Sequence, residues 1–181
     1  MQKHSLRTDG KKRVGDPKLA ARLNKELDGN VLFDKFSRGR YSTDASIYQI
    51  EPIGTVVPMS NADVERTINI AKEEGIPILP RGGGTSQCGQ VLGEALIIDT
   101  SKQLNRILEF DAETKTIEVE PGVVLDDLNR MLKPHKLFFP VDISTGSRAT
   151  IGGMAGNNAC GSRSIRYGNM VHNVLEIDAI L

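Results

Sequence analysis

Glycine is concentrated in two short parts of this chain, and that distribution constrains the fold more than any other feature. Eleven of the 18 glycines fall in two stretches: Gly82, Gly83, Gly84, Gly89 and Gly93, then Gly146, Gly152, Gly153, Gly156, Gly161 and Gly168. Glycine at this density disfavours regular packing unless the backbone approaches another group closely or adopts a positive φ. We therefore expect two backbone loops that each hold a ligand.

The remaining composition is typical of a soluble globular protein. The chain has 181 residues, of which 39% are hydrophobic and 25% charged, and its mean hydropathy is −0.26, which excludes disordered, collagen-like and membrane-spanning classes. Lys and Arg total 23, as do Asp and Glu, so no charge excess predicts a nucleic-acid partner. We expect no secretory signal, because the first 25 residues lack an apolar run. We expect a cytoplasmic protein, or one at the inner face of a membrane.

The cysteines and histidines are too few and too dispersed to predict a metal site or a disulfide framework. Cys88 and Cys160 lie inside the two glycine-rich stretches, and we expect each to be a small residue in tight packing. The histidines are His4, His135 and His172. His135 suits the dipole at a helix end, and His172 is a candidate neighbour of the second stretch.

Apolar residues recur at two spacings, which together predict an α+β fold. Three segments have helical spacing and suitable caps: 16–29, 60–75 and 125–132. Eight segments have strand patterns, one of them (137–139) as a strand or extended run: 47–50, 55–57, 76–79, 95–99, 107–110, 116–120, 137–139 and 174–181. We expect a pairing of 47–50 with 55–57, a βαβ unit over 55–79, a hairpin over 107–120 and a short helix within 142–168.

The order of these elements predicts a lead-in and helix over 1–30, a first lobe over 31–110 and a second lobe over 111–181. Lys11, Lys12 and Arg13 are expected to form a solvated lead-in. The last predicted strand has no residues after it, whereas natural chains usually end in surface tails. We therefore expect a piece of a longer protein.

The first glycine-rich stretch is Pro-Arg-Gly-Gly-Gly-Thr-Ser-Gln-Cys-Gly-Gln, residues 80–90. Three glycines followed by two hydroxyl residues allow successive N–H groups to converge on one point, which suits phosphate oxygens. A P-loop is excluded because no Lys occurs here, and a Rossmann motif is excluded because Gln87 replaces the third glycine. A phosphate-binding loop and a tight surface turn are the two interpretations.

The second glycine-rich stretch runs from Pro140 to Gly161. Its many small residues permit a ligand to lie flat along the backbone, and Thr150, Asn157 and Asn158 supply hydrogen bonds without charge. An extended, partly flat cofactor fits this stretch better than a phosphate alone.

Together these motifs resemble the FAD-binding domain of the vanillyl-alcohol oxidase and p-cresol methylhydroxylase superfamily. They are, in order, Pro-Arg-Gly-Gly-Gly-Thr-Ser, Pro-x-Asp, Thr-Ile-Gly-Gly, Asn-Ala-x-Gly and Arg-Tyr-Gly. The resemblance covers residues from about 38 to 181 and is greatest to the D-lactate, glycolate and D-2-hydroxyglutarate dehydrogenase branch. Residues 39–46, Gly-Arg-Tyr-Ser-Thr-Asp-Ala-Ser, resemble its large bacterial members that also carry iron–sulfur motifs.

The resemblance implies a two-lobed α+β FAD-binding domain of p-cresol methylhydroxylase type, truncated before the substrate cap domain. Residues 81–90 would wrap the FAD pyrophosphate, 140–147 and 150–153 would line the flavin and ribityl chain, and 174–180 would run beside the adenine. The implied cofactor-binding residues are Arg81, Gly82, Gly83, Gly84, Thr85, Ser86, Gly89, Gln90, Pro140, Asp142, Ser147, Thr150, Ile151, Gly152, Gly153, Asn157, Asn158, Gly161 and Ile180. Family members that tether flavin carry a histidine where this chain has Thr85, so non-covalent FAD is implied.

The implied activity is oxidation of a D-2-hydroxy acid by hydride transfer to flavin. The general base and substrate-binding residues would lie in the cap domain, so no catalytic residue is assigned and this chain alone is expected to be inactive. The electron acceptor is open, an iron–sulfur domain of the same full-length chain being one candidate. The alternatives are a sugar-alcohol oxidase, a cell-wall precursor reductase, or a non-redox nucleotide-binding module.

Overall fold

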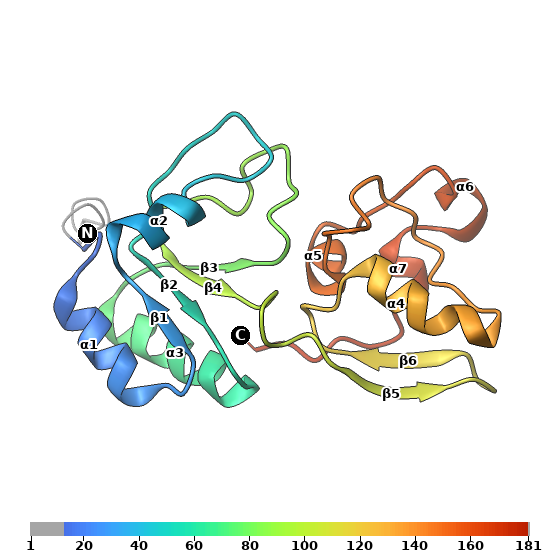
Figure 1. Cartoon of the computed structure of the whole chain (residues 1–181), viewed down its shortest axis with the longest axis horizontal. Helices are drawn as coiled ribbons and strands as arrows, with labels where there is room; N and C mark the ends of the chain where they lie inside the picture. Colours follow the sequence, from blue (N-terminus) through green and yellow to red (C-terminus); the bar gives the residue numbers. More distant parts are fainter. Residues whose placement is uncertain (1–12, 181) are drawn as a thin grey trace, which may run out of the picture. The chain divides into compact units, whose positions relative to one another are not determined.

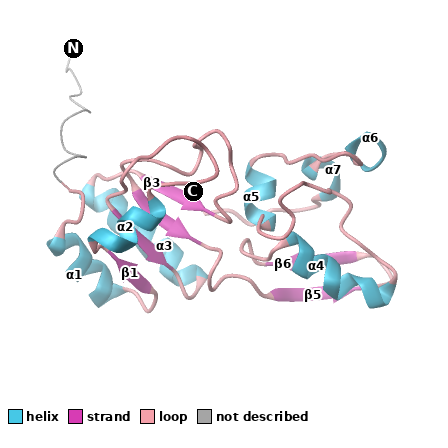
Figure 2. Cartoon of the chain, turned by 45° about the horizontal axis from the view of Figure 1, so that its top comes forward, coloured by secondary structure: helices cyan, strands magenta, loops and turns pink. Residues whose placement is uncertain are grey.

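The computed structural model describes residues 13–180, and the chain divides into two compact units after Asp99 (Figure 1). The first unit contains α1 (Pro17–Glu26), β1 (Asn30–Leu32), α2 (Lys35–Tyr41), β2 (Gly54–Val57), α3 (Asn61–Glu74), β3 (Ile78–Arg81) and β4 (Leu96–Asp99). The second contains β5 (Ile107–Asp111), β6 (Thr116–Val119), α4 (Leu125–Leu132), a 3-10 turn (Lys133–His135), α5 (Ile151–Gly156), α6 (Ser164–Tyr167) and α7 (Met170–Asn173). Both units mix helix and strand (Figure 2), so the predicted α+β class is confirmed.

The first unit is built on a four-stranded sheet in the order β1-β2-β4-β3. β1 is antiparallel to β2, whereas β4 is parallel to both β2 and β3. The two central strands, β2 and β4, are buried along their whole length, as expected for apolar runs within a parallel sheet. The strand predicted over 76–79 is present as β3, shifted to Ile78–Arg81, but it lies at the edge and Ile78 is 37% exposed, so its predicted burial was wrong.

Helices α1 and α3 pack together and supply one side of the core of this unit. Asp16 caps α1 as predicted, because its carboxylate accepts hydrogen bonds from the N–H groups of Lys18 and Leu19. Arg13 donates to the Glu74 carboxylate of α3 over 2.7 Å and is only 22% exposed, so the prediction of a solvated lead-in was wrong for this residue. Lys11 and Lys12, like His4, lie outside the described residues.

The segment that precedes β2 differs most from the sequence prediction. Residues 47–50 form no strand, and only an isolated bridge between Thr43 and Gln49 occurs there. β2 pairs instead with β1, which was not predicted, and with β4. α2 was also not predicted, because Gly39 lies in its middle and glycine disfavours a helix interior, although Asp34 caps this helix by accepting from the N–H of Ser37.

The second unit contains the predicted hairpin, β5 and β6, and the predicted helix α4. Leu125, Leu128 and Leu132 of α4 are buried, as their spacing predicts. Residues 137–139 and 174–180 are not strands, because neither segment pairs with a strand among the described residues. The strand alternative for 137–139 is therefore wrong, and the strand predicted over 174–181 was wrong for 174–180.

The division after Asp99 leaves the whole β5–β6 hairpin in the second unit and places α1 in the core of the first. The sequence analysis predicted the boundary between the lobes after residue 110 and a separate lead-in over 1–30.

Within residues 13–180, no helix has both the length and the apolar character needed to cross a bilayer.

Candidate functional site

The first glycine-rich loop begins at Arg81, where β3 ends, and returns to the sheet at β4. Gly84 and Gly89 have φ of +65° and +71°, a left-handed conformation in which any residue with a Cβ is strained. The Ser86 hydroxyl donates to Gln90 Oε1 over 2.7 Å and accepts from the N–H of Cys88. The loop is therefore a chain of tight turns whose shape depends on glycine.

Arg81 is directed at the backbone of the segment that follows α2. Its guanidinium donates to the carbonyl oxygens of Tyr41 (3.3 Å) and Thr43 (2.8 Å) and lies over the Tyr41 ring at 5.4 Å. The Tyr41 hydroxyl in turn donates to a carboxylate oxygen of buried Asp99 over 2.6 Å. Burial, followed by this hydrogen bond, raises the pKa of the Tyr41 phenol well above its ordinary value.

This neighbouring segment, residues 41–48, is the feature that the site prediction missed. The N–H of Ala45 donates to the carbonyl oxygen of Gly84, and a Cβ on Gly89 would lie 2.9 Å from the Tyr48 ring. Figures 1 and 2 show the loops that follow α2 and β3 running beside each other. The motif at 39–46 was one sequence signal for this segment, but nothing in the sequence indicates that the segment contacts the glycine loop.

In the second unit, Thr150 immediately precedes α5 and caps it, because its hydroxyl oxygen accepts a hydrogen bond from the N–H of Gly153. The N–H of Gly152 donates to the carbonyl oxygen of Pro121 over 2.8 Å, and a Cβ on Gly152 would lie 2.5 Å from the Pro121 side chain. Gly152 is therefore needed for close packing, whereas Gly153 is exposed, and a Cβ there would approach only the Thr150 hydroxyl, at 3.2 Å.

Asp142 and Gly161, both predicted site residues, are in contact. Asp142 accepts hydrogen bonds from the Ser162 hydroxyl (2.8 Å) and from the N–H of Arg163 (2.9 Å). The bond from the Arg163 N–H is the main cause that lowers the pKa of the Asp142 carboxyl, with a further contribution from Ser162. A Cβ on Gly161 would lie 2.1 Å from the Asp142 carbonyl oxygen, so this position requires glycine.

The remaining predicted residues of this unit have different surroundings. Asn158 has φ +45° and its side-chain oxygen accepts from the N–H of Val171 at α7, so its oxygen stabilises the fold locally. Asn157 and Ser147 are exposed, whereas Pro140 and Ile151 are half-buried. Ile180 is 42% exposed on the segment that forms no strand.

The histidines and cysteines of the described residues have ordinary environments. The His135 ring packs edge-on against Phe110 at 4.7 Å, and His172 Nδ1 accepts from the N–H of Asn169 to cap α7. Cys88 and Cys160 are both exposed free thiols, so the prediction that they pack tightly was wrong. Among residues 13–180 no cluster of His, Cys, Asp and Glu could hold a metal ion.

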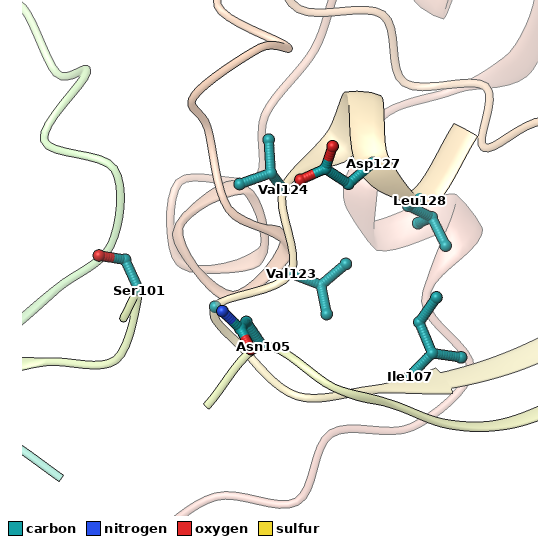
Figure 3. A pocket seen from close by; sticks show the side chains of 8 residues that line it. Ser101, Asn105, Ile107, Val123, Val124, Asp127 and Leu128 are labelled. Atoms are coloured by element: carbon teal, nitrogen blue, oxygen red, sulfur yellow. The ribbon is translucent and has the colours of Figure 1, made fainter. Parts of the chain in front are cut away.

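A pocket of about 230 Å³ lies within the second unit between the hairpin and the start of α4 (Figure 3). It is lined by Ser101, Asn105, Ile107, Gly122, Val123, Val124, Asp127 and Leu128. Asp127 forms an ion pair with Arg130 on the next turn of α4. None of the predicted cofactor-binding residues lines this pocket.

Comparison with known proteins identifies relatives that match most of the chain. A family model described as FAD binding domain matches residues 52–181. The chain is 39% identical over 166 residues to D-2-hydroxyglutarate dehydrogenase of Pseudomonas putida, covering 90% of this chain and 16% of that protein. It is 44% identical over 143 residues to the protein of the same name in Escherichia coli, covering 77% of this chain and 14% of that protein. With glycolate oxidase subunit GlcD of Bacillus subtilis it shares 35% identity, covering 86% of this chain and 34% of that protein.

Solved structures show the same fold at lower sequence identity. An alkyldihydroxyacetonephosphate synthase matches with a TM-score of 0.75 at 22% identity, covering 84% of this chain and 31% of that one. The BBE-like 1 variant D396N of Physcomitrella patens matches with a TM-score of 0.72 at 22% identity, covering 87% and 34%. The chain thus spans at most about a third of the length of each relative named here.

The predicted resemblance is confirmed, and the chain belongs to the family of FAD binding domains.

Proposed function

We propose that this chain is the FAD-binding part of a flavin-dependent dehydrogenase that oxidises a D-2-hydroxy acid. One observation carries this proposal: four bacterial proteins named D-2-hydroxyglutarate dehydrogenase are 37–45% identical to it over 77–90% of its length. Because the chain spans only 14–16% of those proteins, the activity belongs to the whole enzyme. The general base and the groups that bind the acid would lie in the parts not covered.

The residues of the first glycine loop fit the pyrophosphate of FAD. Residues 81–90 contain no carboxylate, and the loop carries the hydroxyls of Thr85 and Ser86 together with the left-handed glycines Gly84 and Gly89. Backbone N–H groups in such turns are the usual partners of phosphate oxygens. We assign the pyrophosphate to this loop, with Arg81, Gly82, Gly83 and Gln90 at its margins.

The residues of the second stretch fit the flavin side of the cofactor. Gly153 and Gly156 are exposed, and a Cβ on Gly156 would meet no atom within 4 Å, so the backbone of α5 is open to a flat ligand. Ionised Asp142 holds the turn that contains Gly161 in place. We assign the flavin and ribityl chain to residues 140–147 and 150–153, with Asn157 and Asn158 close by and the adenine beside 174–180.

When bound, FAD supplies the hydride acceptor for the oxidation. The chain's own residues would bind and orient it: backbone N–H groups together with the hydroxyls and amides of Thr85, Ser86 and Asn157 would hold the cofactor. Non-covalent binding follows from Thr85, which stands where tethering relatives have histidine. A cytoplasmic location and an iron–sulfur electron acceptor in the same full-length chain are further parts of this proposal.

Spectroscopy of the purified chain tests the proposal. After incubation with FAD and gel filtration, we expect flavin absorbance at close to one FAD per chain, and complete release of the flavin on acid precipitation. Retention of colour in the pellet would contradict non-covalent binding. Uptake of ADP or phosphate without any uptake of flavin would instead favour a non-redox nucleotide-binding module.

The substrate class is tested with the full-length enzyme. D-lactate, glycolate and D-2-hydroxyglutarate are added anaerobically, with the L-enantiomers of the two chiral acids as controls. We expect bleaching of the oxidised flavin absorbance by at least one of the three and none by the L-acids. Bleaching only by a sugar alcohol or by a nicotinamide cofactor would refute the hydroxy-acid assignment.

A further inference from the structure

We propose that the 41–48 segment positions the glycine loop for FAD, and that Arg81 is the positioning residue that joins the two. This inference rests on the proposed FAD binding. The family match begins at residue 52, so the 41–48 segment lies outside it. The motif at 39–46 accordingly has no part in the function derived above.

The segment contacts the loop at its beginning, middle and end. Arg81 donates to the carbonyl oxygens of Tyr41 and Thr43 at the beginning. In the middle, the N–H of Ala45 donates to the carbonyl oxygen of Gly84 over 3.2 Å. At the end, Gly89 lies against the Tyr48 ring. The segment therefore supports the loop along its length.

The segment is itself fixed to the sheet. Tyr41 is 6% exposed, and its hydroxyl donates to Asp99, which is 2% exposed at the end of β4. The turn that follows Tyr41 is closed by Asp44, whose carboxylate accepts a hydrogen bond from the N–H of Ser46 over 2.8 Å. A continuous series of contacts thus leads from the sheet through Tyr41 and Arg81 to the glycine loop.

Such support matters because three consecutive glycines lose more backbone entropy on ordering than any other tripeptide. A loop that is already ordered before the ligand arrives binds it more tightly. Arg81 suits this role, since a planar guanidinium donates in a fork and stacks on an aromatic ring, whereas a lysine ammonium does neither as well. Substituting Arg81 by lysine keeps the positive charge but changes the geometry, whereas substituting it by glutamine removes the charge, so the two contributions can be measured separately.

The test compares Arg81→Lys with Arg81→Gln, and uses Arg66→Gln as a matched control, because Arg66 of α3 pairs with Glu26 of α1. Amide hydrogen exchange over residues 84–90 is measured without ligand, and FAD affinity is measured by titration at low and high salt. We expect both Arg81 variants to speed exchange in the loop and to weaken FAD binding about tenfold, with β2 and β4 still protected and the salt dependence unchanged. The control should match the wild type in both measurements.

Two results would overturn this inference. Unchanged exchange in the loop of both variants would show that Arg81 and the 41–48 segment do not order it. Wild-type behaviour of Arg81→Lys, with weaker and less salt-dependent FAD binding in Arg81→Gln, would make Arg81 a direct charge partner of phosphate. Failure of the wild-type chain to bind FAD would refute the proposed function, and hydrogen exchange alone would then decide whether the segment orders the loop.

Discussion

The two glycine-rich regions of this chain share a high glycine content but differ in structure. In the loop over 81–90, Gly84 and Gly89 adopt left-handed backbone conformations that form tight turns. In the segment over 140–161, Gly152 and Gly161 have ordinary φ values but leave no room for a Cβ, which would meet Pro121 or the backbone of Asp142. At these positions glycine therefore allows a left-handed backbone conformation in the first region, and it allows close packing of the backbone in the second.

The two regions also differ in what supports them. The first loop is held by a segment distant in sequence, through Arg81 and the backbone of Tyr41 and Thr43. The second region is held mainly from within its own unit, by the contacts of Asp142 with Ser162 and Arg163 and by the hydrogen bond from the Gly152 N–H to the Pro121 carbonyl oxygen. Substitutions that disturb the 81–90 loop should therefore change ligand binding more than the free energy of unfolding, and substitutions that disturb the 140–161 segment should change the free energy of unfolding more than ligand binding.

The largest expected effect is that of Gly161→Ala. The new Cβ would overlap the Asp142 carbonyl oxygen, a backbone atom that can move only with its neighbours, and such overpacking costs about 1–3 kcal/mol or more. We expect a loss of about 3 kcal/mol in the free energy of unfolding of the second unit, measured by urea denaturation. Gly156→Ala is the control: a Cβ there meets nothing within 4 Å, and alanine should stabilise α5 by about 0.5–1 kcal/mol. Equal stabilities of the two variants would contradict the close-packing role.

A smaller loss of stability, but a clear loss of affinity, is expected for Gly84→Ala. An alanine at φ +65° costs about 1–2 kcal/mol, and its Cβ would lie 2.7 Å from the Arg81 guanidinium. FAD titration should show binding at least about tenfold weaker, which corresponds to about 1.4 kcal/mol. Gly39→Ala is the matched control, since that helical glycine has open space around it. Wild-type affinity in a folded Gly84→Ala protein would mean that this loop does not bind the cofactor.

The smallest expected effect is the contribution of Asp142 to the pH dependence of stability. The N–H of Arg163 lowers the pKa of this carboxyl in the folded chain, so its contribution to stability is present above the ordinary value of about 3.9 and is lost as the pH falls through the lowered pKa. Thermal melting of wild type and Asp142→Asn should therefore show a difference at pH 7 that shrinks at pH 3. A constant difference across this range would contradict the assignment.

The parts of the fold that the sequence predicted are those in which local signals agree with packing. α1, α3 and α4 have caps or regular apolar spacing, and the β5–β6 hairpin has alternating residues around a tight turn. The sheet order was not predictable in this way, because the insertion of β4 between β2 and β3 depends on contacts distant in sequence. α2 was not predicted either, because glycine in a helix interior is unfavourable and Gly39 lies in its middle.

The candidate site shows the same limit. The glycine motifs indicated where the backbone has special geometry, and Gly84, Gly89, Gly152 and Gly161 do have it. Side-chain partners were not predictable, since nothing in the sequence indicates that Arg81 reaches Tyr41 and Thr43. The strand predicted over 174–181 is likewise absent from 174–180, because a strand requires a neighbour that no described residue supplies.

Amide chemical-shift mapping tests the central claim, that the two glycine-rich regions bind different parts of FAD. ADP carries the pyrophosphate and adenosine but no flavin, so we expect it to shift the amide signals of residues 82–90 and leave those of 150–157 unchanged. FAD should shift both sets at one equivalent per chain. Shifts of residues 150–157 by ADP, or no shift of residues 82–90 by either ligand, would contradict this division between the two regions.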